Sequence, residues 1–277
     1  MTLKKETTGE WYVTFGLEVE DTALPEKPDV DDLDTEDYVG VDLGITNYIY
    51  TSDGDSVDWL DPSDEYDRLR QAQRSLSRKE HGSNNWEKQR REVAKVKRRI
   101  KRKVEDFQHK LTTWLAKTYD AVFVEDLNVS GMLQQRGNAR NKQDASCRGF
   151  IEMLEYKGDL YGTHIVQVNP AGTTKECAEC GVESEKPLWV REHSCPSCGF
   201  KTDRDANASL NVLSRGLQEL GLGQAESTPV ETAIPVGTGG GRPSSVPASR
   251  VIETGSLGIV RKSSSSVMTR DEVSQTT

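Results

Sequence analysis

Residues 38–44 read YVGVDLG, an apolar run that contains one carboxylate, Asp42. An ionised Asp on a buried strand requires a cation or several hydrogen bonds, so Asp42 is a candidate metal ligand. The run predicts a strand over Tyr38–Leu43, and two more predicted strands follow it closely, Asn47–Thr51 and Ser56–Leu60. Three strands this close in sequence predict a β-meander.

Two more carboxylates stand at the ends of predicted elements further along the chain. The apolar run Ala121–Val124 predicts a buried parallel strand, and Glu125 follows it directly. Asp205 precedes a predicted helix over Ala206–Leu220. Two strand ends and one helix start can converge. Asp42, Glu125 and Asp205 would then bind a pair of divalent ions that activates water for phosphodiester hydrolysis.

Four cysteines form a frame with the spacing C-x2-C-x14-C-x2-C: Cys177, Cys180, Cys195 and Cys198. Two CxxC pairs provide the four-thiolate cage that Zn2+ prefers, so we predict one structural zinc ion. A complete set of four thiolates leaves no need for the nearby His193 as a ligand.

Each candidate carboxylate also has a structural interpretation. Asp205 would stabilise the start of its helix, and Asp203 fits the capping role about as well. Asp126 competes with Glu125, although strand alternation lets only one of two neighbours face a site. The order of Asp42, Glu125, the cysteine frame and Asp205 along the chain is more specific evidence for such a metal site than any one of these features.

The segment Asp64–Thr118 is almost free of Gly and Pro except at His81-Gly82-Ser83, which predicts a hairpin of two helices. The second helix is predicted from Asn84. Its apolar stripe consists of Val93, Val96, Ile100, Val104, Phe107, Leu111, Trp114 and Leu115. Its other faces carry Arg90, Arg91, Lys95, Lys97, Arg98, Arg99, Lys101, Arg102 and Lys103. Charges of one sign repel one another, so a nucleic-acid partner is favoured over an ordinary solvated face.

The other predicted elements are a strand over Glu10–Glu20, an acidic linker over Asp21–Asp37, a loop over Gly131–Gln143, a helix over Arg148–Tyr161 and a strand over His164–Val168. From Gly221 to Thr277 the chain is rich in Gly, Ser, Thr and Pro. We expect this tail to be disordered, because it cannot bury enough apolar surface to offset the entropy of ordering.

The net charge of −9 is distributed unevenly over the 277 residues. Residues 1–64 hold 18 acidic and 3 basic residues, whereas residues 65–110 hold 16 basic and 7 acidic residues. The acidic background predicts a salt-adapted protein. The single Cys147 outside the frame favours a reducing, cytoplasmic setting over a disulfide-bonded one. We expect no signal peptide in the polar Met1–Glu10 and no membrane span, because no apolar run approaches 18 residues.

These segments together resemble the TnpB (OrfB) proteins of insertion sequences, which are RNA-guided nucleases related to type V CRISPR effectors. The matching blocks are VGVDLGITNYIYTSDG, LSRKEHGSNNWEKQRREVAKVKRRI, VFVEDLNVSGM, YKGDLYGTHIVQVNPAGTTKECAECG and HSCPSCGFKTDRDANASLNVL. They cover roughly Tyr38 to Leu213 in the order typical of the family.

The resemblance implies an α/β fold with an RNase H-like (RuvC) mixed sheet, a long basic helical insertion and an inserted four-cysteine zinc ribbon. Asp42, Glu125 and Asp205 correspond to its catalytic carboxylates, which would bind two Mg2+ or Mn2+ ions. The implied domains are a remnant of a β-rich wedge domain with an acidic linker (1–37), a nuclease core (38–170) with the helical insertion (64–119), a zinc ribbon that binds target nucleic acid (171–202), the last helix (203–220) and a disordered tail (221–277).

The implied function is that of a probable transposase, a metal-dependent DNA endonuclease guided by RNA from the transposon end. DNA and guide RNA are the expected partners, acting in transposition and DNA recombination, with a nucleoid-associated location. Family members usually carry a longer region before the first catalytic Asp than the 41 residues present here. Two alternatives therefore stay open. One is a non-cleaving, nucleic-acid-binding remnant, and the other is a junction-resolving or RNase H-type enzyme of the same fold.

Overall fold

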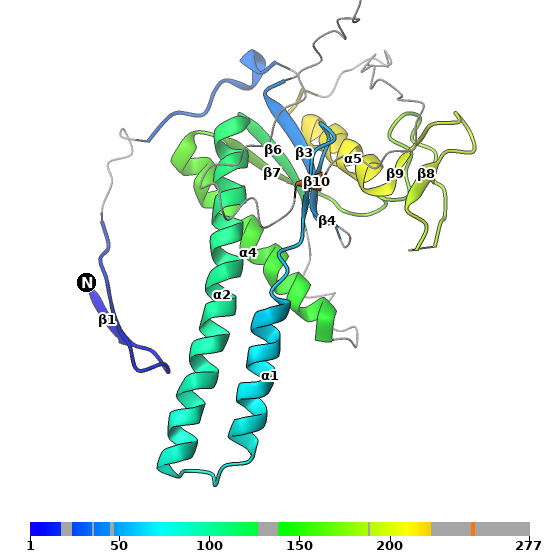
Figure 1. The fold of residues 1–277 in the computed structure, drawn as a ribbon. Coiled ribbons are helices and arrows are strands. Elements are labelled where there is room, and N and C mark those ends of the chain that lie inside the picture. The colour runs from blue at the N-terminus through cyan, green and yellow to red at the C-terminus, as the bar shows by residue number, and fades with distance from the viewer. Residues whose placement is uncertain are drawn as a thin grey trace, which may run out of the picture.

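The computed structural model describes residues 1–17, 24–34, 36–44, 47–126, 138–187, 189–222 and 245–246, with the backbone alone for residues 138–146 and 245–246. Its centre is a mixed sheet of six strands in the order β10-β5-β4-β3-β6-β7 (Figure 1). The strands are β3 (Tyr38–Asp42), β4 (Asn47–Thr51), β5 (Ser56–Asp58), β6 (Ala121–Glu125), β7 (His164–Val168) and β10 (Ser245–Val246). Strands β3, β4 and β5 are antiparallel neighbours, whereas β3, β6 and β7 run parallel.

One face of the sheet packs against α2 (Asn84–Thr118) and α4 (Asn138–Tyr161). Val122 of β6 lies on this face, in a core that also contains Phe107 of α2 and Cys147 of α4. Because side chains alternate along a strand, the neighbouring residues of β6 point to the opposite side.

The opposite face is covered by α5 (Arg204–Glu219), against which Phe123 of β6 packs. Two glycines allow an unusually close approach. A methyl group on Gly40 of β3 would overlap the backbone of α5 at Ser209, and one on Gly216 of α5 would overlap the ring of Phe123. The distance between α5 and the sheet is therefore set by these two missing side chains.

A helical hairpin formed by α1 (Ser63–Ser77) and α2 projects from the sheet (Figure 1). Ser83 caps α2 by accepting a hydrogen bond from the backbone N–H of Trp86 at 3.1 Å. Gly82, just before it, has a left-handed φ of +80° that suits the turn. Of the predicted apolar stripe, the buried members are Val93, Ile100, Phe107, Leu111 and Leu115. None of the helices in the described part of the chain is both long enough and apolar enough to span a bilayer.

Two small sheets lie outside the central one. Their strands are β1 (Thr2–Lys5) with β2 (Trp11–Thr14), and β8 (Glu192–Ser194) with β9 (Lys201–Asp203). The first pair is an N-terminal hairpin beside α2 (Figure 1). The second pair belongs to the cysteine-containing segment between β7 and α5, which we call the ribbon (residues 171–203). A short 3-10 helix, η2 (Val30–Asp32), lies in the linker before β3.

The predictions of β3, β4, β6, β7, the helical hairpin and α5 are confirmed apart from single end residues or pairs of them. Strand β5 ends at Asp58 rather than Leu60, and β2 is shorter than the predicted strand over Glu10–Glu20, of which residues 18–20 lie outside the described part. Strand β1 was not predicted, because the polar sequence TLKK has no apolar alternation.

Two loop-like predictions differ from the structure. The loop prediction over Gly131–Gln143 is wrong from Asn138 onward, where the backbone is already helical and continuous with α4. A growing helix adds one hydrogen bond per residue, so it extends through polar sequence that lacks an apolar stripe. Ser245 and Val246, within the tail expected to be disordered, pair with β5 in parallel. Residues 131–137, 223–244 and 247–277 lie outside the described residues.

Candidate functional site

Three buried carboxylates lie where β3 and β6 end and α5 begins. Asp42 and Glu125 are the last residues of β3 and β6, and the parallel register pairs Val41 with Val124 directly before them. Asp205 lies in the first turn of α5. The exposed fractions of Asp42, Glu125 and Asp205 are 5%, 7% and 6%. The structure thus brings the three predicted carboxylates to one end of the sheet, and their catalytic role stays a prediction.

The neighbouring acids take other positions. Asp203 is the N-cap of α5, because its Oδ1 accepts a hydrogen bond from the backbone N–H of Asp205 at 2.8 Å. The carboxylate of Asp205 instead accepts a hydrogen bond from the guanidinium of Arg191. Asp126 is exposed, whereas Glu125 is buried. Of Asp203 and Asp205, it is therefore Asp205 that lies in the site. Of the neighbours Glu125 and Asp126, it is Glu125.

Burial raises the pKa of Asp42 well above its ordinary value, and the charges of Glu125 and Asp205 raise it further. Burial also raises the pKa of Glu125, although a hydrogen bond from Thr173 offsets part of the rise. The pKa of Asp205 is raised by burial too, against the opposing charge of Arg191. Three carboxylates that resist ionisation together favour a divalent cation, which supplies the missing positive charge.

Hard oxygen donors of this kind fit Mg2+ or Mn2+. Among the described residues, however, only the four cysteines place three or more possible ligand atoms within 4.8 Å of one another. The carboxylates are less tightly gathered, and Arg191 lies against one of them, Asp205. A divalent cation bound here would compete with that guanidinium for the Asp205 oxygens.

Sequence reasoning missed three residues that surround the carboxylates: Tyr50, Thr173 and Arg191. Tyr50 lies opposite Asp42 in the register of β3 and β4, and burial raises the pKa of its phenol to about 12. Thr173 and Arg191 come from the ribbon, and each contacts a different carboxylate. These contacts join residues far apart in sequence, so no local pattern indicates them.

The four cysteines of the predicted frame meet in the ribbon. Cys177 and Cys198 have their Sγ atoms 3.7 Å apart, and those of Cys180 and Cys195 are 3.5 Å apart. All four are free thiols. The thiols differ in their pKa: a hydrogen bond from the backbone N–H of Cys198 is the main cause that lowers the pKa of Cys195 to about 6, whereas burial raises the pKa of Cys177 to about 12. Cys195 is therefore the more readily ionised of these two thiols. Four soft sulfur donors at this spacing fit a tetrahedral Zn2+ ion.

Two glycines close the turns that present these thiols. Gly181 and Gly199 have φ values of +71° and +79°. Their N–H groups donate to the carbonyls of Cys177 and Cys195 at 2.8 and 3.2 Å. His193 is buried in the ribbon but lies outside this group of close ligand atoms in the described part of the chain.

Most of the basic residues of α2 form ion pairs with acidic side chains, which was not predicted from the sequence. Arg98 contacts Glu6, Glu10 and Tyr12 of the N-terminal hairpin. Glu65, a buried residue of α1, pairs with Lys103 and more distantly with Arg99. The other contacts are the ion pairs Arg90–Glu87, Lys95–Glu92, Lys101–Glu105 and Lys110–Asp106 and the hydrogen bond of Arg102 to Tyr12. The expected self-repulsion of this face is therefore reduced by acids from three elements.

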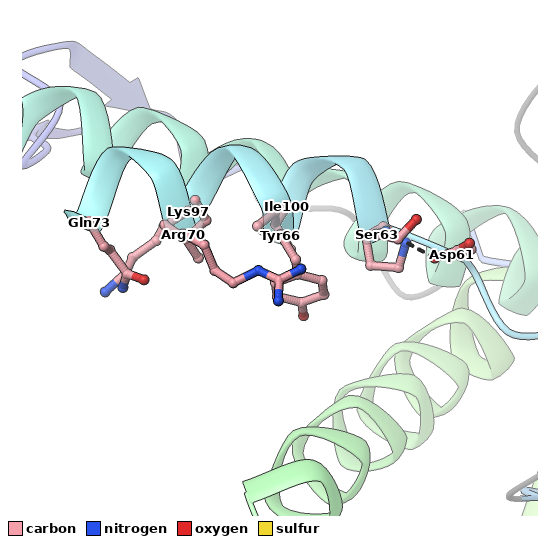
Figure 2. Close-up of a pocket in the computed structure, with 9 residues that line it drawn as sticks. Asp61, Ser63, Tyr66, Arg70, Gln73, Lys97 and Ile100 are labelled. Carbon is pink, nitrogen blue, oxygen red and sulfur yellow. Dashed lines mark hydrogen bonds between the residues drawn. The ribbon is translucent and has the colours of Figure 1, made fainter. Parts of the chain in front are cut away.

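Two of the predicted nucleic-acid contacts, Arg91 and Lys97, are exposed and form no ion pair with any described residue. Lys97 also lines a groove of about 810 Å3 between α1 and α2. Figure 2 shows Tyr66, Arg70 and Gln73 extending from α1 along this groove. An aromatic ring beside basic groups in a groove is suited to bases and phosphates of nucleic acid.

The mixed sheet with its helices, the buried acidic residues and the four-thiol cluster define an α/β protein with a cysteine cluster that could hold a metal ion. Two family models match it: the "Probable transposase" model of OrfB proteins of IS605 type over residues 17–136, and the "Cas12f1-like, TNB domain" model over residues 148–212. Together with the similarity to curated relatives, these two matches support assignment of the chain to the TnpB/OrfB family.

Two curated relatives are similar to this chain over most of its length. A "Putative RNA-guided DNA endonuclease" of Streptomyces pristinaespiralis is 39% identical over 222 residues, which are 78% of this chain and 52% of that protein. "Putative RNA-guided DNA endonuclease InsQ" of Escherichia coli K12 is 29% identical over 236 residues, 79% of this chain and 57% of that protein. The chain therefore spans about half the length of the curated relatives it matches. A chain in a CRISPR-Cas12f ternary complex matches 63% of this chain and 38% of its own length, at 19% identity and a TM-score of 0.45, which carries no conclusion about the fold.

Proposed function

We propose that this chain carries the nuclease site of a transposon-associated, RNA-guided DNA endonuclease that acts in transposition and DNA recombination. The observation that carries the proposal is the common burial of Asp42, Glu125 and Asp205 at one end of the sheet. Their raised pKa values reflect a deficit of positive charge that a divalent cation would fill. Membership of the family and the names of its relatives support the same function.

In this proposal Asp42, Glu125 and Asp205 hold Mg2+ or Mn2+. Divalent ions in such a site activate water and stabilise the leaving oxygen of a phosphodiester. The chain's own residues orient the carboxylates and exclude bulk water. Thr173 donates a hydrogen bond to Glu125, and Asp203 caps α5 so that Asp205 is left for the site. Arg191 neutralises Asp205 when no cation is bound.

Several finer features belong to the same proposal. The sheet is that of an RNase H-like (RuvC) nuclease, and the four cysteines hold one Zn2+ ion. The exposed Arg91 and Lys97, and the groove that Lys97 lines, contact DNA or a guide RNA from the transposon end. The protein works at the nucleoid, and its acidic surface adapts it to high salt. At about 1 M salt the Debye length is about 3 Å, so phosphate binding would depend on close contacts.

The test is cleavage of DNA by the purified chain with a guide RNA and Mg2+ or Mn2+. Asp42→Ala, Glu125→Ala and Asp205→Ala should each abolish cleavage, because each removes a ligand of the divalent ions. The matched control is Asp126→Ala, which removes an exposed acid next to Glu125 and should leave the rate unchanged. Cleavage at the wild-type rate by any of the first three variants would show that the assignment of the triad is wrong.

The ion pair between Arg191 and Asp205 favours a second candidate, nucleic-acid binding without cleavage. In this candidate the guanidinium permanently occupies one of the carboxylates, and the ribbon and basic helices still bind DNA or RNA. The purified protein would then shift labelled DNA or RNA in a gel but would show no cleavage with either Mg2+ or Mn2+.

A further inference from the structure

The base of the ribbon is fastened to α5 by two buried asparagines. Asn207 accepts a hydrogen bond from the backbone N–H of Ala178 at 3.0 Å and donates to the carbonyl of Glu176 at 2.7 Å. Asn211, one turn later, donates to the carbonyls of Thr173 and Glu176 at 2.8 Å each. The exposed fractions of Asn207 and Asn211 are 0% and 5%, so these hydrogen bonds are shielded from water.

The turn held in this way ends in a cysteine of the four-thiol cluster. The backbone N–H groups of Lys175 and Glu176 donate to the carbonyl of Gly172 at 2.8 and 2.9 Å, so the turn is internally closed. Cys177 follows directly, and its Sγ belongs to the cluster. A metal ion held by the four thiols would therefore fix the end of this turn through Cys177, while the two asparagines hold the turn on α5.

The same turn contacts the carboxylate site through Thr173. Its Oγ1 lies 2.5 Å from Oε1 of Glu125 and 3.1 Å from the carbonyl of Pro170. A hydroxyl can donate only one hydrogen bond, and the closer acceptor, the carboxylate of Glu125, accepts it. Thr173 is 2% exposed, so this hydrogen bond is buried as well. One residue thus joins the carbonyl held by Asn211 to the carboxylate of Glu125.

We infer that Thr173, held by Asn207 and Asn211, is a positioning residue that links closure of the zinc ribbon to the orientation of Glu125. This inference rests on the proposed function, because it treats Glu125 as a ligand of the divalent ions. A ribbon closed by zinc holds Thr173 in place, and Thr173 then holds the Glu125 carboxylate ready for the cation. An open ribbon releases the turn, and the affinity of the carboxylate site for divalent cations falls.

The experiment measures Mn2+ binding to the full chain, by the electron paramagnetic resonance signal of free Mn2+, with zinc content determined in parallel. Thr173→Val removes the hydroxyl and keeps the shape, and it should weaken Mn2+ binding about tenfold while zinc content stays unchanged. Thr173→Ser restores the hydroxyl and should bind within about twofold of wild type. Thr202→Val, on β9 of the same ribbon, is the matched control and should bind as wild type does.

Removal of zinc tests the link itself. Zinc-free wild-type protein should lose Mn2+ affinity, whereas zinc removal from Thr173→Val should cause a much smaller further loss, because the connection is already broken. Asn211→Leu, which releases the carbonyl of Thr173, should reproduce part of the Thr173→Val defect. Higher Mn2+ concentration should restore DNA cleavage by Thr173→Val, which would not occur if the substitution simply unfolded the site.

Two outcomes would overturn the inference in different ways. If wild-type protein binds Mn2+ and Thr173→Val binds it equally well, Thr173 does not position Glu125, and the proposed function is unaffected. If the wild-type protein binds no Mn2+ at all, the carboxylates are not a divalent-metal site, and the proposed function fails together with the inference.

Discussion

Arg191 of the ribbon and Asp205 of α5 form an ion pair across the boundary between the cysteine cluster and the carboxylate site. The side chain of Arg191 is 36% exposed, whereas that of Asp205 is 8% exposed. The guanidinium of Arg191 therefore reaches solvent, whereas the carboxylate of Asp205 lies within the site. Arg191 is thus the partner that a divalent cation at Asp205 would have to displace.

Replacing Arg191 should strengthen the binding of divalent ions. In Arg191→Gln no guanidinium competes for Asp205, and partly exposed ion pairs contribute roughly 0.2–1 kcal/mol. We expect Mn2+ to bind about two- to fivefold more tightly, as measured by calorimetric titration. Arg148→Gln, which removes an arginine paired with Glu152 on α4, should leave the affinity unchanged. Unchanged affinity in Arg191→Gln would mean that the arginine does not compete with the cation.

Asp42 should make the cation-free protein sensitive to pH. The pKa of Asp42 is raised in the folded protein, so the folded state binds its proton more readily than the unfolded state does. Its stabilising contribution is fully present below the unfolded pKa of about 3.8 and is lost as the pH rises through the folded pKa. Asp42→Asn cannot ionise, and without divalent ions it should exceed wild type in free energy of unfolding at pH 8 by about 1–3 kcal/mol.

Urea unfolding at pH 5 and pH 8 measures this difference. The gap between Asp42→Asn and wild type should be smaller at pH 5, and Mg2+ should stabilise the wild type more than the variant. Asp126→Asn, at the exposed neighbouring acid, should show neither effect. A variant no more stable than wild type at pH 8 would contradict the assignment of Asp42 as a poorly compensated buried charge.

Much of this arrangement could be predicted from local sequence. The carboxylates Asp42 and Glu125 at the ends of two apolar runs indicated two strand ends that meet when the strands are parallel neighbours. The 3.6-residue period and the break at Gly82 indicated α2 from Asn84 to its last residue, Thr118. These features are local, so composition and periodicity are enough to find them.

The parts that escaped prediction depend on contacts between distant residues. Arg98 is neutralised by Glu6, 92 residues earlier in the chain, and no pattern around Arg98 indicates that partner. Thr173 reaches Glu125 over 48 residues, and its sequence context is that of an ordinary turn. The choice between Asp203 and Asp205 likewise required the capping geometry of α5, because both residues occupy plausible positions in sequence.

Gly216→Ala should separate α5 from the sheet. A methyl group there overlaps the ring of Phe123, so the helix or the ring must move. We expect the free energy of unfolding to fall by about 1–3 kcal/mol, measured by chemical unfolding, and Mn2+ affinity to fall because Asp205 moves with the helix. Ser214→Ala, at an exposed position of the same helix, should cause no loss. Equal stability of the two variants would show that the close approach is not required.

The four thiols should hold one metal ion that stabilises the ribbon. Metal analysis of the purified protein should find about one zinc per chain, and Cys195→Ser should reduce this content and lower the melting temperature, because structural zinc contributes directly to folding. Cys147→Ala, which removes the thiol in the core of the α2–α4 face, should retain zinc. If zinc-free wild-type protein kept the same melting temperature, the four thiols would not form a stabilising zinc site.

Arg98 should fasten the N-terminal hairpin to α2. Its guanidinium contacts Glu6 and donates hydrogen bonds to Thr8 at 2.9 Å and to Tyr12 at 2.8 Å. In Arg98→Ala we expect chymotrypsin to cleave within residues 1–17 roughly tenfold faster, because charge-assisted hydrogen bonds are lost. Arg91→Ala removes an exposed arginine of the same helix and should not change the cleavage rate.

The position of α5 also sets the order in which the protein can be completed during synthesis. Strands β3 and β6 leave the ribosome early with Asp42 and Glu125, but Asp205 follows only after the whole ribbon. A nascent chain that has not yet released α5 therefore lacks Asp205, the third carboxylate of the proposed site. On our proposal this site is completed only after α5 is released and packs against Gly40 and Phe123.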